Sequence, residues 1–126
     1  MSIHSRAAAT PVLDELERRP GAGTAVLHWF SGTLAELQRA VELDCWFSVG
    51  PAMLGTAQGR RLLNSMPRER LITESDGPFA QEHGHPVLPW QLGSAIRAIG
   101  EAWGESNSSV QRQLLRNLRV LVETAT

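Results

Sequence analysis

Short apolar runs alternate with longer stretches of helical spacing along this chain, and no other feature constrains its fold as strongly. The apolar runs cover residues 2–4, 25–28, 45–49 and 71–74, and each ends in a polar or turn-forming group. Alternation of this kind is typical of βα units around a parallel sheet. We therefore predict an α/β fold in which outer helices cover parallel strands.

The stretches between the runs carry signals for helix ends and for buried helix faces. Thr10 is predicted to cap a helix that has Pro11 at its first position and stops at Pro20–Gly21. Ser108 or Ser109 is expected to cap the last helix. The apolar positions expected to face the core in the other helical stretches are Leu34, Leu37 and Val41, then Leu62, Leu63 and Met66, then Leu92, Ile96, Ile99 and Trp103, and finally Val110, Leu114, Leu118 and Leu121.

Composition limits the possible classes of function. The 126 residues suffice for one domain, 1–126, with one core. The net charge is −1 and all 12 basic residues are arginines spread along the chain, so no overall basic field exists to hold a polyanion. The single cysteine, Cys45, excludes an intrachain disulfide and a multi-cysteine zinc site, and it fits a reducing cytoplasm. No apolar run approaches 18 residues, so we expect no membrane partner.

Side chains that can bind metal ions follow three of the four apolar runs. His4 and His28 end the first two runs, and Asp76 lies just after Glu74, which ends the fourth. Catalytic groups of parallel βα folds collect at the carboxyl ends of the strands, so these residues are expected to meet in space. Imidazole and carboxylate groups suit zinc, manganese or magnesium. The sequence therefore predicts a candidate divalent-metal site at His4, His28 and Asp76.

Ordinary structural roles compete with these interpretations. A single strand-end histidine is more often a hydrogen-bonded structural residue than a ligand. The segment Asp76–Gly77–Pro78 has the composition of a plain turn within a turn-rich loop over 75–89. In the same loop, the H-x-H spacing of His83 and His85 is more typical of a solvated segment than of a metal site. Cys45 has the surroundings of a small buried apolar residue rather than of a nucleophile.

Several motifs, taken in order, resemble those of the TatD family of metal-dependent deoxyribonucleases. They are Ile3-His4-Ser5-Arg6-Ala7, His28-Trp29-Phe30-Ser31-Gly32, Phe47-Ser48-Val49-Gly50 and Thr73-Glu74-Ser75-Asp76-Gly77-Pro78. The closing Asn117-Leu118-xx-Leu121 is similar to the family's final helix. Trp29 and the segment 47–53 most resemble the TatD-type members found in Qat anti-phage operons.

The resemblance implies a distorted TIM barrel with a two-metal centre that hydrolyses phosphodiester bonds in DNA. By this resemblance His4 and His28 match two histidine ligands of one metal ion. Asp76 matches the aspartate that binds the other ion and orients or deprotonates the attacking water. Glu74 matches the supporting glutamate of the same motif, and Arg6 is expected to face a phosphate.

Two features of the family have no counterpart before His4: the H-x-H motif of the first strand and the bridging glutamate. A complete TIM barrel needs about 250 residues, so we expect the C-terminal half of a barrel, beginning in mid-strand through a late start codon, a gene fragment or a truncated product. Such a half should hold at most one weak metal site and have impaired activity. Two alternatives stay open: an inert remnant or interaction subunit that keeps the half-barrel, and an unrelated small α/β binding domain.

A half-barrel leaves two sheet edges and part of its inner face uncovered. We therefore expect self-association, or a partner that covers the open edge. The candidate residues for this uncovered surface are Ile3, Val26, Leu27, Phe47, Val49 and Ile72. Some of them are expected to face the helices instead, because successive strand residues point in opposite directions.

Overall fold

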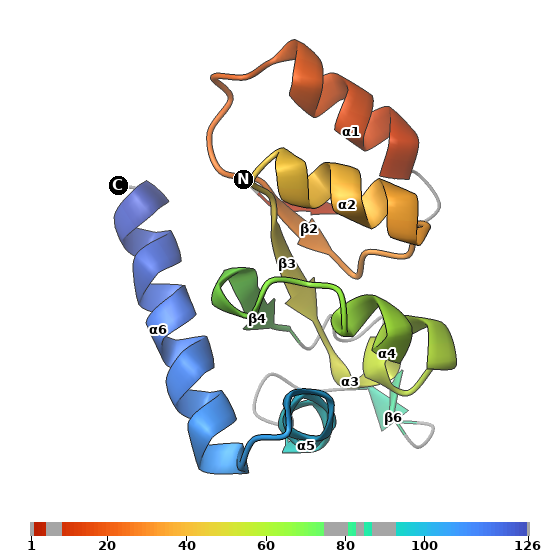
Figure 1. Cartoon of the computed structure of the whole chain (residues 1–126), viewed down its shortest axis with the longest axis vertical. Coiled ribbons are helices and arrows are strands. Elements are labelled where there is room, and N and C mark those ends of the chain that lie inside the picture. The colour runs from red at the N-terminus through yellow and green to blue at the C-terminus, as the bar shows by residue number, and fades with distance from the viewer. Residues whose placement is uncertain (1, 5–8, 75–80, 83–84, 87–92, 126) are drawn as a thin grey trace.

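Four parallel strands form the main sheet, in the order in which they occur along the chain (Figure 1). They are β1 (Ser2–His4), β2 (Val26–His28), β3 (Trp46–Val49) and β4 (Leu71–Thr73). The computed structural model describes residues 2–4, 9–74, 81–82, 85–86 and 93–125. Each of the four predicted apolar runs contains a strand, and in three cases the strand is one residue shorter than the run.

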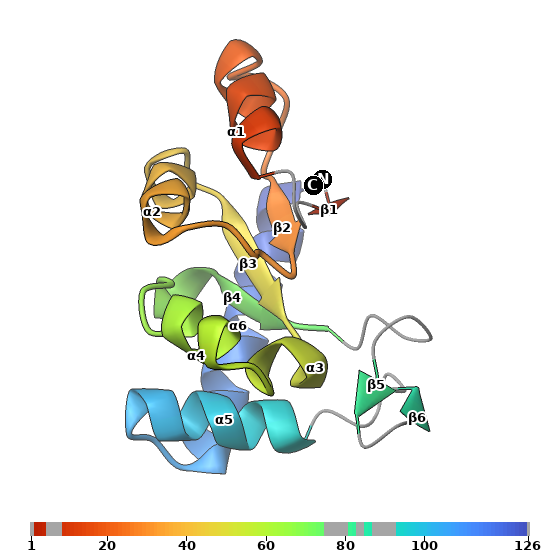
Figure 2. The same cartoon turned by 90° about the vertical axis from the view of Figure 1, so that its right-hand side faces the viewer.

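Helices separate the successive strands of the main sheet, as the alternation predicts, and two further helices follow β4. They are α1 (Ala9–Arg18), α2 (Leu34–Glu42), α3 (Pro51–Leu54), α4 (Ala57–Leu63), the 3-10 turn η1 (Arg68–Arg70), α5 (Gly93–Trp103) and α6 (Asn107–Ala125). Figure 2 shows α2 and α4 on one side of the strands and a short antiparallel pair, β5 (Gln81–Glu82) with β6 (His85–Pro86), on the other. This pair lies inside the predicted turn-rich loop. The α/β architecture is that of a partial barrel.

The helix-covered face of the sheet forms the core. Leu27, Phe47 and Leu71 lie side by side on β2, β3 and β4, and none of them is exposed. Phe30, just after β2, packs its ring edge against Phe47 at 6.0 Å between centroids. Burial of such side chains contributes about 1.5–3 kcal/mol each, so this row and the helices above it fix the positions of the strands.

Two predicted helix caps are wrong, because both helices begin before the residue that was expected to cap them. α1 already begins at Ala9, and Thr10 lies inside the helix, where its Oγ1 donates a hydrogen bond to Glu36 Oε2 at 2.5 Å. α6 begins before Ser108, and Ser106 Oγ accepts the N–H of Ser109 at 3.1 Å. The hydroxyl that lies outside the first turn is the one that caps.

The predicted apolar stripes contain both buried and partly exposed residues, and Leu92 lies outside the described part of the chain. Leu34 at the start of α2 and Leu118 on α6 are exposed, although their spacing predicts burial. On α6 the buried position beside Leu118 is taken by Asn117. Its Nδ2 donates to the backbone oxygens of Arg68 and Leu71, both at 2.7 Å, and so attaches α6 to the start of β4.

The predicted uncovered surface is also largely wrong. Leu27, Phe47 and Val49 belong to the buried core under the helices, and Val26 is 7% exposed. Only Ile3 and Ile72, on the two edge strands, are partly exposed. The large apolar side chains that are exposed on the other elements belong mainly to α6, at Leu115, Leu118, Val120 and Val122.

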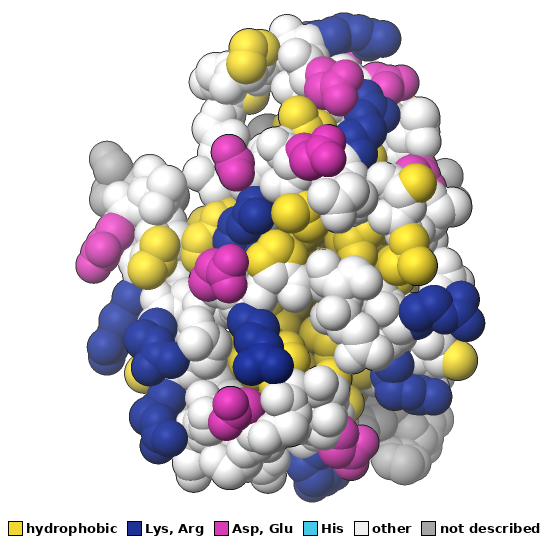
Figure 3. Space-filling view, in the orientation of Figure 1, with side chains coloured by type: hydrophobic (Ala, Val, Ile, Leu, Met, Phe, Trp, Pro, Cys, Tyr) yellow, Lys and Arg dark blue, Asp and Glu magenta, His cyan; other side chains and the backbone are white. Residues whose placement is uncertain are grey.

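The face that carries α2 and α4 has a surface of mixed charge. In Figure 3, acidic and basic side chains are interspersed among apolar ones, and no histidine is visible among the described residues on this side. No helix among the described residues is long and apolar enough to cross a membrane.

Candidate metal centre

One row of residues crosses the sheet at the carboxyl ends of its strands. The ladders pair His4 with His28, His28 with Ser48, and Ser48 with Ile72. The backbones of the two predicted strand-end histidines are therefore neighbours, although 24 residues separate them in sequence. The side chain of His4 lies outside the described part of the chain, as do Arg6 and Asp76, so their contacts stay predictions.

Three side chains from this edge converge: His28, Ser48 and Glu74. Ser48 Oγ donates to Glu74 Oε2 at 2.5 Å and lies 3.1 Å from His28 Nδ1, and the same Glu74 oxygen contacts His28 Nδ1. Ser48 is 1% exposed, and the side chains of Glu74 and His28 are 9% and 27% exposed. A largely buried carboxylate thus holds an imidazole that keeps access to solvent.

The backbone around these residues fixes their positions. Trp29, directly after His28, has a φ of 42°, which is rare for a bulky residue, and its N–H donates to Ser48 O at 3.2 Å. The N–H of Glu74 donates to Val49 O at 2.8 Å, which extends the β3–β4 pairing beyond β4. A Cβ on Gly50 would lie 2.6 Å from the backbone oxygen of Glu74, so only glycine permits this close approach.

These three residues do not form a nucleophilic triad, although serine, histidine and glutamate are all present. In such triads the serine and the acid bind opposite nitrogens of the imidazole. Here Ser48 and Glu74 both lie on Nδ1 of His28. Ser48 is also buried and gives its proton to Glu74, so it supports the carboxylate and does not attack a substrate.

The donor set fits a divalent cation. A histidine held by a carboxylate on one ring nitrogen is the usual arrangement of metal-binding imidazoles. Glu74 Oε1 is buried and has no hydrogen-bond partner in the described part of the chain, so it can take a further positive group. Within that part, no cluster of three or more potential ligand side chains occurs. A complete coordination sphere therefore needs ligands from outside the described residues.

Ser48 lies within one of the family-like motifs, but the motif alone does not indicate its role. A signal was available: Ser48 is the only polar residue inside an otherwise apolar run, and a serine inside a buried strand needs a partner. Which partner it takes depends on contacts 20 and 26 residues away. The pattern of a single run does not contain this information.

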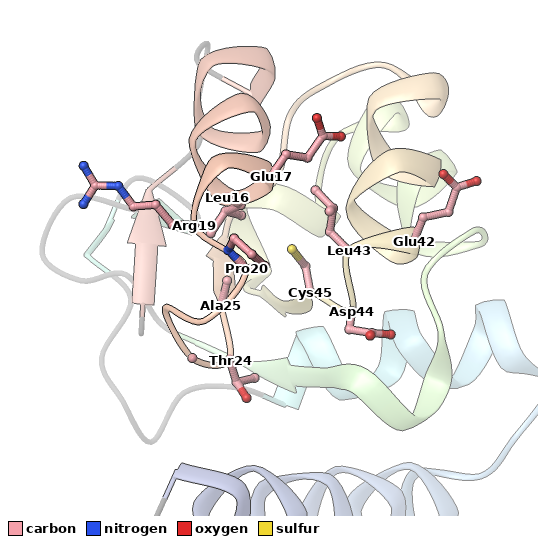
Figure 4. Close-up of a pocket in the computed structure, with 11 residues that line it drawn as sticks. Leu16, Glu17, Arg19, Pro20, Thr24, Ala25, Glu42, Leu43, Asp44 and Cys45 are labelled. Carbon is pink, nitrogen blue, oxygen red and sulfur yellow. The ribbon is translucent and has the colours of Figure 1, made fainter.

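A cavity of about 410 Å³ lies at the amino ends of β2 and β3, away from this site (Figure 4). Its acidic residues do not converge: Glu17 binds Arg39, Asp44 is exposed beside Arg70, and Figure 4 shows Glu42 pointing outward. The hydrogen bond from Arg39 lowers the pKa of Glu17. Burial raises the pKa of Cys45 to about 11, so its thiol is protonated at neutral pH. This cavity offers no arrangement for catalysis.

Comparisons with known proteins show the family of the chain. The model of the TatD-related DNase family matches residues 1–123. The chain is 36% identical over 121 residues to the "3'-5' ssDNA/RNA exonuclease TatD" of Klebsiella pneumoniae, an alignment that covers 84% of this chain and 43% of that protein. It is 33% identical over 106 residues to the "Uncharacterized metal-dependent hydrolase TatD" of Mycobacterium tuberculosis, covering 80% of this chain and 40% of that protein.

A solved structure extends the likeness to three dimensions. The crystal structure of YJJV, a TatD homologue from Escherichia coli K12, superposes with a TM-score of 0.81 at 26% identity and covers 95% of this chain. The match covers 48% of that structure's chain, so the present chain spans about half the length of the relatives it resembles. The ordered motifs, the parallel sheet with its strand-end histidines and these matches together establish that the chain belongs to the TatD-related DNase family.

Proposed function

We propose that this chain contributes the C-terminal half of a divalent-metal-dependent hydrolase of phosphodiester bonds, with DNA as its substrate. The observation that most supports this proposal is the convergence of His28, Ser48 and Glu74 at the carboxyl edge of the sheet, in a chain of the TatD-related family. Relatives whose names specify a deoxyribonuclease or a DNA exonuclease support DNA as the substrate.

In this proposal each residue has a separate task. His4 and His28 bind one divalent ion, which is zinc, magnesium or manganese, and Asp76 binds a second. A bound divalent ion supplies Lewis-acid polarisation of the phosphate and a more acidic water. Asp76 orients the attacking water and accepts its proton. Glu74 positions His28, and Arg6 binds a non-bridging phosphate oxygen through its guanidinium.

We expect the chain alone to bind metal at one weak site and to have little activity. His28 and Glu74 are the only described metal-capable side chains that meet at this edge. Zinc sites are normally built from three or four protein ligands, and a single ion does not clamp both the attacking and the leaving oxygen. The other half of a barrel would have to supply the missing ligands.

Cleavage of labelled single-stranded DNA tests this function. The purified chain should cleave slowly or not at all with Mn²⁺, and fusion to or co-expression with the N-terminal half of a TatD relative should restore cleavage. Asp76→Ala and His28→Ala should abolish the restored activity, while Glu42→Gln, at the opposite end of the sheet, should retain it. Cleavage that survives both site substitutions would refute the proposal, and fast cleavage by the chain alone would refute the expected impairment.

We further propose that a second polypeptide covers the open edge of the sheet. β1 and β4 each have a strand neighbour on one side only among the described residues. Beside β4, an apolar groove of about 270 Å³ runs between Ile72 and the exposed Leu115 and Leu118 of α6. For the isolated chain the expected occupant is a second copy. Sedimentation velocity should find dimers that Leu118→Arg dissociates, whereas a concentration-independent monomer would refute this.

The likeness of Trp29 and the segment 47–53 to Qat-type members supports a role in anti-phage defence. The single cysteine supports a cytoplasmic location. The defence role is tested by phage plaque counts on two kinds of cells. One carries the intact operon, and the other carries an operon that encodes the Asp76→Ala variant.

A further inference from the structure

We infer that Glu74 and Ser48 are positioning residues that fix the tautomer of His28, with the proton on Nδ1 and the lone pair on Nε2. The inference deepens the proposed function, because a metal ion binds the ring nitrogen that carries the lone pair. It does not require that a metal be bound, since it concerns the imidazole and its two neighbours in the protein.

The hydroxyl proton of Ser48 decides where the imidazole proton lies. Ser48 has a single hydroxyl proton, and the 2.5 Å contact gives it to Glu74 Oε2. The oxygen of Ser48 lies 3.1 Å from His28 Nδ1 and, having donated elsewhere, can only accept there. Glu74 Oε2, the other neighbour of Nδ1, is a carboxylate oxygen and also accepts. Because both neighbours of Nδ1 among the described residues are acceptors, the proton of the neutral imidazole belongs on Nδ1.

Burial makes this preference strong. Ser48 is 1% exposed and the Glu74 side chain 9%, so water competes little for their hydrogen bonds. With the proton on Nε2 instead, the lone pair of Nδ1 would face the carboxylate oxygen without a hydrogen between them. Such a repulsive contact, in partly buried surroundings, disfavours that tautomer.

The backbone keeps Glu74 within reach of the imidazole. Its N–H is bound to Val49 O at 2.8 Å, and Gly50 lies close against its carbonyl. His28, Ser48 and Glu74 therefore keep their spacing through three adjacent strand ends and not through flexible side chains alone. The carboxylate and the hydroxyl together act as one holder for the imidazole.

Long-range ¹H–¹⁵N correlation spectra of the metal-free, ¹⁵N-histidine-labelled chain measure the tautomer directly. The His28 signals are assigned by their loss in His28→Asn. We expect the Nδ1–H form in the wild-type chain above pH 7.5. Glu74→Ala should shift His28 towards the Nε2–H form that solvated histidines prefer. Glu74→Gln, which keeps an acceptor oxygen, should retain the Nδ1–H form, and the control Glu42→Gln should change nothing.

Two outcomes would overturn the inference: an Nε2–H form in the wild-type chain, or an unchanged tautomer in folded Glu74→Ala. If Glu74→Ala does not fold, Ser48→Ala is measured in its place. We then expect a partial shift of His28 towards the Nε2–H form, and an unchanged tautomer would count against the inference.

Cobalt titration separates this inference from the proposed function. If both hold, Glu74→Ala weakens cobalt binding about 10- to 100-fold. An Nδ1–H tautomer in a chain that binds no cobalt would overturn the function and leave the positioning role supported. Cobalt binding with an Nε2–H tautomer would do the reverse.

Discussion

The two ends of the parallel sheet differ in how their polar side chains are arranged. The amino end has a hollow of about 410 Å³, bordered by Glu17, Glu42 and Asp44. The carboxyl end has three polar side chains from adjacent strand ends within hydrogen-bond reach of one another. Convergence and burial of polar groups, and not the volume of a hollow, therefore identify the candidate site.

The difference follows from how each end is built. At the carboxyl end, register places His28 and Ser48 directly beside each other on neighbouring strands. At the amino end, the acidic residues stand on helix ends and turns, where they pair with separate arginines or point outward. Asp44, for example, has a side chain that is 94% exposed and lies 3.5 Å from Arg70. Exposed pairs of this kind contribute about 0–1 kcal/mol.

Gly50→Ala should produce the largest effect and break the carboxyl end. The new Cβ would meet the backbone oxygen of Glu74 at 2.6 Å, and a backbone atom does not move aside as a side chain does. We expect the free energy of unfolding to fall by about 3 kcal/mol, measured by urea denaturation. Gly21→Ala, whose Cβ would meet nothing within 4 Å, is the matched control at the amino end. Equal stability of the two variants would contradict this account.

Asn117→Ala should have the next largest effect, on stability alone. The substitution removes the donor to the backbone oxygens of Arg68 and Leu71, of which the bond to Leu71 is buried, and this costs about 2 kcal/mol. Because the bonds lie at the amino end of β4, the tautomer of His28 should not change. A changed histidine spectrum in the folded variant would mean that the two ends are coupled.

Cys45 should make stability fall at alkaline pH. Burial raises the pKa of its thiol to about 11 in the folded chain, from an ordinary value of 9.0. Between these two pKa values the folded state keeps a proton that the unfolded state releases. The contribution of the thiol to stability is therefore fully present below pH 9 and is lost as the pH rises towards 11. Wild type should lose more Tm than Cys45→Ala between pH 8.5 and 10.5. Parallel losses would show that the thiol is not the cause.

Glu42→Gln should have the smallest effect. Substitutions at exposed positions without buried partners usually change stability by less than about 0.5 kcal/mol. We therefore expect unchanged urea denaturation and unchanged metal binding. Weaker metal binding in this variant would reveal a function at the amino-end cavity and would reverse the ranking of the two ends.

The sequence predicts the elements better than it predicts their contacts. Strand positions follow from the apolar runs, and the neighbouring strand ends of His4 and His28 follow from parallel pairing. The short helix α3 gave no periodic signal because four residues span little more than one turn. Leu34 and Leu118 fit their stripes and are nevertheless exposed, since periodicity defines a helix face but not what covers it.

The roles of individual polar residues were the least predictable. Thr10 could cap its own helix by sequence, yet it bonds Glu36, 26 residues away. Asn117 binds backbone oxygens 46 and 49 residues away, and Ser48 depends on two partners from other strands. Side-chain hydrogen bonds of this range require the folded register, which a pattern of neighbouring residues does not contain.

Calorimetric titration of the purified chain with zinc tests the central claim most directly, that the carboxyl end is the metal centre. We expect one weak site in the wild-type chain, its loss in His28→Ala and its retention in Glu42→Gln. Equal binding by wild type and His28→Ala, or two tight sites per chain, would contradict the account.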